Sequence, residues 1–183
     1  MSTCRACLEP MIGEVAYHSR CLEELFHAKR PPALDIDTAR LHAAALSMVG
    51  HTSLSGVQKK ISLGLSVDKE ALTVVSGGSQ YILKPQAGAF PSLPENEQLT
   101  TRLAKLVGIE TAPAGLLELT DGTLAFIIRR FDRLPKGRKV RQEDFCQLAQ
   151  QAPKDKYRSS AEQCVRIVRQ YASEPHRQAG GWA

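Results

Sequence analysis

Long apolar runs are missing from this sequence. No window approaches about 18 uninterrupted apolar residues, so no membrane-spanning helix is expected. The N-terminus lacks a positively charged stretch followed by an apolar one, and no signal peptide is expected either. Aromatic residues make up only 5%, which argues against a base-stacking surface for nucleic acid. The five cysteines are odd in number and unevenly spread, so a secreted disulfide framework is not expected and the cytoplasm is the predicted location.

The remaining composition is that of a globular protein. Hydrophobic residues make up 43% and charged residues 23% of the chain. A length of 183 residues allows one core, or a small module beside a core of about 120 residues. The formal charge of +5 is compatible with nucleotide, phosphorylated or nucleic-acid partners and selects none of them.

Residues 1–30 hold three of the five cysteines and a histidine, in the pattern C-x2-C followed by H-x2-C. A C-x2-C turn places Cys4 and Cys7 on one side, and His18 with Cys21 can complete a tetrahedral Zn²⁺ site. A stretch this short needs such a link in order to fold. The spacing matches no zinc-finger type closely, so the alternative is a reduced, partly buried cysteine cluster at the start of an extended arm.

Residues 31–50 are predicted to form a linker and then a helix. A proline pair precedes Asp37, which can cap a helix that ends at Gly50. The next loop, TSLSGVQKK, carries a glycine, two serines and two lysines. Main-chain amides and positive charge in such a loop can surround a polyphosphate. The loop matches neither common glycine-rich phosphate motif, so by itself it is better interpreted as a basic surface turn.

Alternating or continuous apolar residues predict five strands, at residues 61–67, 72–75, 81–84, 116–119 and 124–128. Asp121-Gly122 predicts a hairpin turn between the last two. The third strand ends in Lys84, which must reach the sheet edge or meet an anion because its neighbours are apolar.

A helix is predicted over residues 94–107, with proline and acidic residues in its first turn. Glu97 in this helix can pair with Lys84 and hold it in position; alternatively it only complements the helix dipole. The buried face of the helix is expected to consist of Leu99, Leu103, Leu106 and Val107. Two further helices are predicted at residues 142–151 and 160–171, before a tail without periodicity. The predicted class is α+β.

Five ordered segments resemble one family. They are SLSGVQKKISL, YILKP, ENE with LAKLVGI, AFIIRRFDR and RQEDFCQ, spread over about residues 38–158. They resemble the HipA family, the serine/threonine kinase toxins of bacterial type II toxin–antitoxin systems, and look closest to its compact HipT-like branch. The resemblance implies a protein-kinase-like N-lobe over residues 51–133 and the start of a helical C-lobe over residues 134–183.

The resemblance also implies residue roles. Ser53 or Ser55 would be autophosphorylated, and the added negative charge would pull the loop out of its ATP-binding form. Lys84 would contact the nucleotide phosphates, with Glu97 as its partner. The phosphates would be covered by the loop residues Gly56, Val57, Gln58, Lys59 and Lys60.

The adenine base would contact the main chain of a hinge that runs from Arg129 to Phe131, with Phe131 beside the base. In the better-known toxin the hinge begins with an acidic residue where this chain has Arg129, so only main-chain contacts are expected there. Asp132 and Arg133 are expected to form a structural ion pair.

The family's C-lobe supplies a catalytic aspartate in a D-x-H-x-x-N segment and a second, metal-binding aspartate further on. The sequence contains neither. Phosphoryl transfer needs a group to orient the substrate hydroxyl and a carboxylate to hold Mg²⁺. We therefore expect a truncated or split kinase that is inactive alone.

The family implies three kinds of partner: a HipB-like antitoxin, a separate C-lobe or HipS-like chain, and a protein substrate, which in the family is an aminoacyl-tRNA synthetase. The alternative function is a non-catalytic binding module that sequesters an antitoxin or complements a separate C-lobe chain. A zinc-dependent nucleic-acid binder is the third and least favoured hypothesis.

Overall fold

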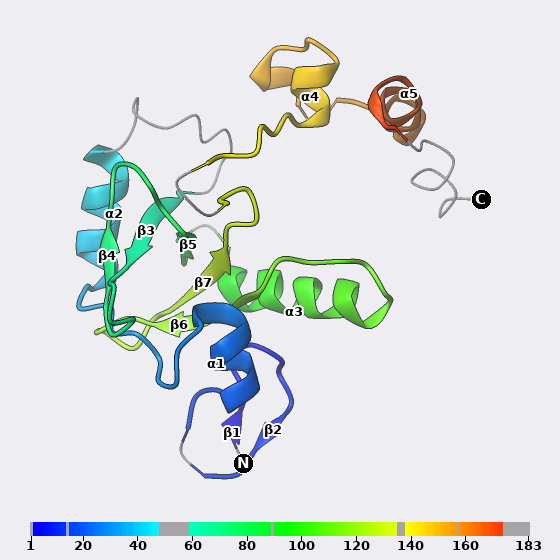
Figure 1. The fold of residues 1–183 in the computed structure, drawn as a ribbon. Coiled ribbons are helices and arrows are strands. Elements are labelled where there is room, and N and C mark those ends of the chain that lie inside the picture. The colour runs from blue at the N-terminus through cyan, green and yellow to red at the C-terminus, as the bar shows by residue number, and fades with distance from the viewer. Residues whose placement is uncertain are drawn as a thin grey trace. The chain divides into compact units, whose positions relative to one another are not determined.

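The computed structural model describes residues 2–13, 15–47, 59–88, 90–134, 138–156 and 158–173. The chain divides into two units, Met1–Arg138 and Lys139–Ala183. The first unit carries a five-stranded antiparallel sheet with helices, and the second is helical (Figure 1). The expected α+β class is confirmed.

A small module opens the first unit. Its two short strands, β1 (Ser2–Thr3) and β2 (Pro10–Met11), pair antiparallel, and helix α1 (Ser19–Phe26) follows. Helix α1 is amphipathic because its apolar positions recur one turn apart, and it buries Cys21, Leu22, Leu25 and Phe26. The helix ends where His27 takes a left-handed conformation, with φ of 51°.

The sheet has the strand order β4-β3-β5-β7-β6, and every neighbouring pair is antiparallel. Its strands are β3 (Ile61–Leu65), β4 (Leu72–Val74), β5 (Tyr81–Pro85), β6 (Ala114–Glu118) and β7 (Leu124–Arg129). All five predicted strands are therefore confirmed, with ends that shift by one or two residues. Pro85 is the last residue of β5 and lies opposite Ala125. Proline is tolerated at a strand end because it interrupts few ladder hydrogen bonds there.

The β6–β7 hairpin closes at the predicted Asp121-Gly122 turn, where Gly122 has φ of 79°. The Asp121 carboxylate accepts hydrogen bonds from the amides of Thr38 and Thr123, both at 3.0 Å. These amides hold the pKa of Asp121 far below its usual range. Thr38 opens helix α2 (Thr38–Ser47), and the amide of Arg40 bonds the side chain of Asp37, as expected for its cap. The predicted end at Gly50 lies outside the described residues.

Helix α3 (Leu93–Leu106) packs on β6 and β7. Its predicted buried face is wrong: Leu99, Leu103, Leu106 and Val107 are 48%, 53%, 64% and 74% exposed. Pro94 and Gln98 are buried instead. The reason is that the polar side of the helix contacts the N-terminal module, which leaves the leucine side facing outward.

The second unit contains α4 (Phe145–Leu148), a 3-10 turn (Pro153–Asp155) and α5 (Ala161–Tyr171). The helix predicted at residues 142–151 is far shorter, because a capping box between Asp144 and Gln147 starts it late and Gln150 leaves helical conformation. Helix α5 matches its prediction. Among the described residues, no helix has the length and apolarity to cross a membrane.

Candidate functional site

Lys84 and Glu97 form an ion pair between the sheet and helix α3. The Lys84 ammonium also lies 5.3 Å from the ring centroid of Phe126, its neighbour on β7. The side chains of Lys84 and Glu97 are 20% and 26% exposed, so the pair is largely shielded and still open to solvent on one side. The pairing that the sequence predicted is confirmed. It creates a fixed ammonium at the end of a strand.

The strand alternation explains why Lys84 faces α3. Side chains along β5 alternate between the two faces of the sheet, so Lys84 points opposite to Tyr81. The Tyr81 hydroxyl bonds the carbonyl of Leu25 in α1, at 3.1 Å. Helices α1 and α3 therefore contact opposite faces of the sheet, and the ion pair lies on the α3 face.

The predicted phosphate loop enters β3 beside Lys84. Strand β3 pairs with β5 in the register Ile61↔Leu83, which brings the chain just before Ile61 alongside Lys84. Of the loop residues, Lys59 is exposed and Lys60 is partly buried. The other candidates, Ser53, Ser55, Gly56, Val57 and Gln58, lie outside the described residues.

The predicted hinge follows β7. The Arg129 guanidinium contacts the ring of His27, on the Tyr81 face and away from Lys84. The amides of Arg129 and Arg130 donate to Pro113 and Gln80, each at 2.8 Å. Phe131, which follows them, is 68% exposed. A base contact by Arg129 would therefore use its carbonyl rather than its side chain or amide.

Asp132 forms the structural ion pair that the sequence predicted, and a second one besides. Its side chain is 4% exposed and accepts from Arg130 at 2.8 Å and Arg133 at 2.6 Å. The hydrogen bond from Arg130 holds the pKa of Asp132 below its usual range. Arg130 also donates to the Ser79 hydroxyl, at 3.1 Å, which ties the hinge to the turn before β5.

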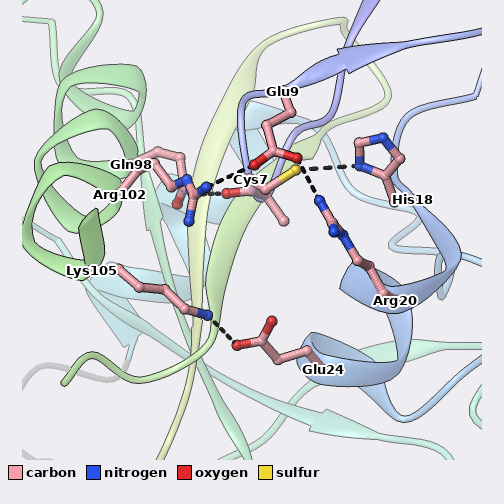
Figure 2. A network of polar contacts seen from close by, with 9 residues as sticks. Cys7, Glu9, His18, Arg20, Glu24, Gln98, Arg102 and Lys105 are labelled. Atoms are coloured by element: carbon pink, nitrogen blue, oxygen red, sulfur yellow. Dashed lines mark hydrogen bonds and ion pairs between the residues drawn. The ribbon is translucent and has the colours of Figure 1, made fainter. Parts of the chain in front are cut away.

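The four predicted metal ligands converge. The ligand atoms of Cys4, Cys7, His18 and Cys21 all lie within 4.8 Å of one another. Tetrahedral Zn²⁺ with Zn–S bonds of about 2.3 Å would hold ligand atoms roughly 3.5–3.8 Å apart, so the cluster needs little adjustment to fit the ion. The Cys7 sulfur points to the His18 ring, and Sγ and Nδ1 are 3.3 Å apart (Figure 2).

The thiols of this cluster have unequal acidity. Burial would raise the pKa of Cys4, but the amides of Cys7, Ala6 and His18 outweigh it and lower the pKa to about 7. Burial, reinforced by the two neighbouring thiols, raises the pKa of Cys21 to about 12. Several thiolates at once are therefore unfavourable unless a cation balances them, and a divalent metal would supply that balance.

The module is joined to the sheet at β6. The amide of Leu116 donates to the carbonyl of Arg5, at 2.8 Å, and the buried Tyr17 hydroxyl donates to the carbonyl of Leu116. A Cβ on Gly115 would lie 3.2 Å from that same Arg5 oxygen, a tight contact, so glycine lets the turn pack here without a shift of the main chain. The cysteine turn therefore packs directly on an edge strand of the sheet.

Three polar residues of α3 complete the contact with the module, and the sequence analysis did not select them. Gln98 donates a hydrogen bond to the carbonyl of Ala6. Arg102 pairs with Glu9 at 2.9 Å, and Lys105 pairs with Glu24 at 2.6 Å (Figure 2). The one available signal was their helical spacing, which places Gln98, Arg102 and Lys105 on one side of the helix.

Comparison with known proteins identifies the family. The model of the HipA-like C-terminal domain matches residues 52–180. This chain belongs to the HipA-like C-terminal domain family. The HipA resemblance of the five sequence segments is thereby confirmed.

The HipA-like relatives include proteins named as kinases. "Putative kinase Y4mE" of Sinorhizobium fredii is 32% identical over 131 residues, which cover 67% of this chain and 31% of the relative. A "Putative kinase" of Haemophilus influenzae is 36% identical over 95 residues, covering 50% of this chain and 27% of the relative. "Putative kinase Y4dM" of Sinorhizobium fredii is 33% identical over 126 residues, 57% of this chain and 29% of the relative. The chain thus spans less than a third of each of these relatives.

Proposed function

We propose that this chain supplies the nucleotide-binding half of an ATP-dependent serine/threonine-protein kinase. The ion pair of Lys84 with Glu97 carries the proposal. A lysine held by a glutamate at the end of a strand already has one conformation, so it loses little side-chain entropy when its ammonium contacts the phosphates. The names of the relatives and the family membership support the same activity.

In this proposal the residues bind and orient MgATP. Lys84 contacts the phosphates, and the loop from Gly56 to Lys60 covers them with amides and charge. The hinge from Arg129 to Phe131 binds adenine through its main chain. Mg²⁺ neutralises the developing charge during transfer. The groups that orient the substrate hydroxyl and hold the metal come from elsewhere in a complete kinase, because the sequence lacks the D-x-H-x-x-N segment.

The biological setting proposed is a cytoplasmic type II toxin–antitoxin system. The partner would be a HipB-like antitoxin, and the substrate a protein such as an aminoacyl-tRNA synthetase. Phosphorylation of Ser53 or Ser55 would place negative charge in the phosphate loop and lower its affinity for ATP. These roles rest on the HipA family membership.

Calorimetric titration with MgATP tests the nucleotide site. We expect Lys84→Ala to weaken binding at least about tenfold, because a charge-assisted hydrogen bond is lost. Lys139→Ala is the matched control, since it removes one positive charge from an exposed position in the second unit. Equal affinities of wild type and Lys84→Ala, or no binding by either, would count against the proposal.

We also propose that Cys4, Cys7, His18 and Cys21 bind one Zn²⁺ in a structural role. All four positions are protein ligands, so no place is left for a reacting water. Elemental analysis should find one zinc per chain, and Cys7→Ser should lose most of it. Cys146→Ser is the control because Cys146 is also a buried thiol and is not one of the four clustered residues. Substoichiometric zinc in wild type would refute the proposal.

A second proposed function is protein contact through the exposed side of α3. Leu99, Leu103, Leu106 and Val107 form an apolar stripe of the kind found at protein interfaces. The proposed occupant is a polypeptide carrying the remaining kinase lobe, because the relatives are more than three times as long as the segment they share with this chain.

Co-purification with such a polypeptide, taken from a full-length relative, tests this contact. Leu99→Gln combined with Leu103→Gln should abolish it. Val67→Gln changes an apolar residue outside α3 that is still more exposed, and it should have no effect. Unchanged co-purification of the double variant would rule out the stripe as the interface.

A further inference from the structure

In one turn, helix α3 contacts both the sheet and the N-terminal module. Glu97 reaches Lys84 in the sheet, and the adjacent residue Gln98 reaches the carbonyl of Ala6 in the N-terminal module. Ala6 lies within the turn between Cys4 and Cys7. The metal cluster and the Lys84–Glu97 pair are therefore connected through two consecutive residues of one helix.

The contact is continued along the helix by charges. Arg102 pairs with Glu9 and Lys105 with Glu24, so successive turns of α3 are joined to the module (Figure 2). Glu9 lies in the segment between Cys7 and His18, and it also pairs with Arg20. Gln98 is only 2% exposed, which shields its hydrogen bond to Ala6 from water.

The module has little regular secondary structure to hold its shape by itself. Its strands are two residues long and α1 has eight residues, lengths that are not stable alone. Leu25 and Phe26 at the end of α1 pack into the main core, which also includes Cys4 and Cys21. The turn that carries the Ala6 carbonyl lies between Cys4 and Cys7, two ligands of the proposed metal, so the metal would restrain this turn from both ends.

We propose that metal binding in the module fixes the position of α3 and thereby the Lys84–Glu97 pair, so that metal and nucleotide bind cooperatively. The proposal rests on the zinc and nucleotide sites proposed above. A helix moves as a rigid body over one turn, so release of Gln98 displaces Glu97 with it. Cooperative binding is reciprocal: the metal raises nucleotide affinity, and bound nucleotide raises metal affinity by the same factor.

Hydrogen–deuterium exchange on the full chain tests the coupling without any nucleotide. Removing zinc with a chelator should speed exchange of the α3 amides by about tenfold or more while the amides of β3 and β5 stay protected. Unchanged exchange in α3 after complete metal removal would overturn the proposal. So would equal acceleration in every element, because that would report loss of the whole fold rather than release of one helix.

A variant isolates the link while the metal stays bound. Gln98→Met preserves length and removes the donor to the Ala6 carbonyl, and combined with Arg102→Ala it should speed α3 exchange at one zinc per chain. Arg5→Ala is the matched control: Arg5 pairs with Glu118 on β6, so it joins the module to the sheet and not to α3. Identical exchange in the double variant and wild type would contradict the coupling.

MgATP titration of zinc-loaded and zinc-free protein gives the functional readout. We expect at least about fivefold weaker binding without zinc, the lower end of usual coupling between sites. Equal affinities would overturn the cooperative proposal. Metal-dependent exchange of α3 in a chain that binds no MgATP would instead refute the nucleotide site and support the metal-dependent placement of Glu97. A chain that takes up no zinc would overturn both the zinc site and its coupling to the Lys84–Glu97 pair.

Discussion

The side-chain amide of Gln98 donates a hydrogen bond to the main-chain carbonyl of Ala6, 92 positions earlier in the chain. This contact joins the cysteine turn to the helix that bears Glu97. Cysteine spacing, a strand-end lysine and a helix glutamate are separate signals in the sequence. In the fold they belong to one connected arrangement of side chains.

The ion pair of Lys84 with Glu97 should act as a unit in nucleotide binding. Lys84→Ala and Glu97→Ala should each weaken MgATP binding, and the double variant should be no worse than the weaker binder of the two. Calorimetric titration should give a coupling free energy of about 0.5–3 kcal/mol. Lys139→Ala combined with Glu97→Ala should be additive, because Lys139 is an exposed residue with no proposed role in the nucleotide site. Additive losses for the first pair would contradict a shared role.

Tyr17→Phe should lower the free energy of unfolding by about 1 kcal/mol, because the buried carbonyl of Leu116 loses its donor. Urea unfolding followed by circular dichroism measures the change. Tyr171→Phe is the control: Tyr171 is 53% exposed, and its loss of a hydroxyl should change stability by less than about 0.5 kcal/mol. Equal stability of Tyr17→Phe and wild type would show that the hydroxyl does not hold the module on β6.

Asp132 should make the fold sensitive to acid. Its pKa is lowered in the folded state, so the folded protein gains stability above the unfolded pKa of about 4 and loses it as the pH falls further. Asp132→Asn should cost about 2–4 kcal/mol at pH 7, because the guanidinium groups of Arg130 and Arg133 lose their buried counter-ion.

The acid test compares urea unfolding of wild type and Asp132→Asn at pH 7 and pH 3.5. The variant should lose less stability between the two values than wild type does. The difference between the proteins is the informative quantity, since any metal bound at the cysteine cluster would leave both at acid pH. Asp35→Asn, at an exposed aspartate, should behave like wild type. Equal acid-induced losses in Asp132→Asn and wild type would refute the assignment.

The leucine side of α3 should contribute little to folding. Leu103→Ala, at a residue 53% exposed, should change the free energy of unfolding by less than about 0.5 kcal/mol. Leu83→Ala, at a fully buried position of β5, should cost about 2–5 kcal/mol. Urea unfolding of both variants decides the matter. A large loss for Leu103→Ala would mean that the helix face is buried after all.

Local patterns in the sequence predicted most of the fold. The five strands follow from apolar alternation, and the hairpin follows from Asp121-Gly122, since both signals act over a few neighbouring residues. The convergence of Cys4, Cys7, His18 and Cys21 followed from the chemistry of a short segment that needs a link. The pairing of Lys84 with Glu97 followed from a lysine near the end of one strand and a glutamate near the start of the next helix.

The placement of elements against one another could not be read in the same way. The leucine spacing in α3 predicted a buried face, but periodicity says only that a helix has an apolar side and not what covers it. The contacts of Gln98 and Arg102 join residues about ninety positions apart, and polar residues on a helix ordinarily face water. The helix expected at residues 142–151 is shorter because it starts at a capping box and ends before Gln150, whose main chain is left-handed, and helix propensity specifies neither feature.

Strand β6 is an edge of the sheet, and the outward amide and carbonyl of its Leu116 are bonded by the N-terminal module, through the Arg5 carbonyl and the Tyr17 hydroxyl. An uncovered edge of this kind is a template on which other chains can add strands. The module therefore shields the protein from edge-to-edge aggregation. Under the proposed metal dependence, zinc removal should uncover this edge and lower the solubility of the protein as well as its nucleotide affinity.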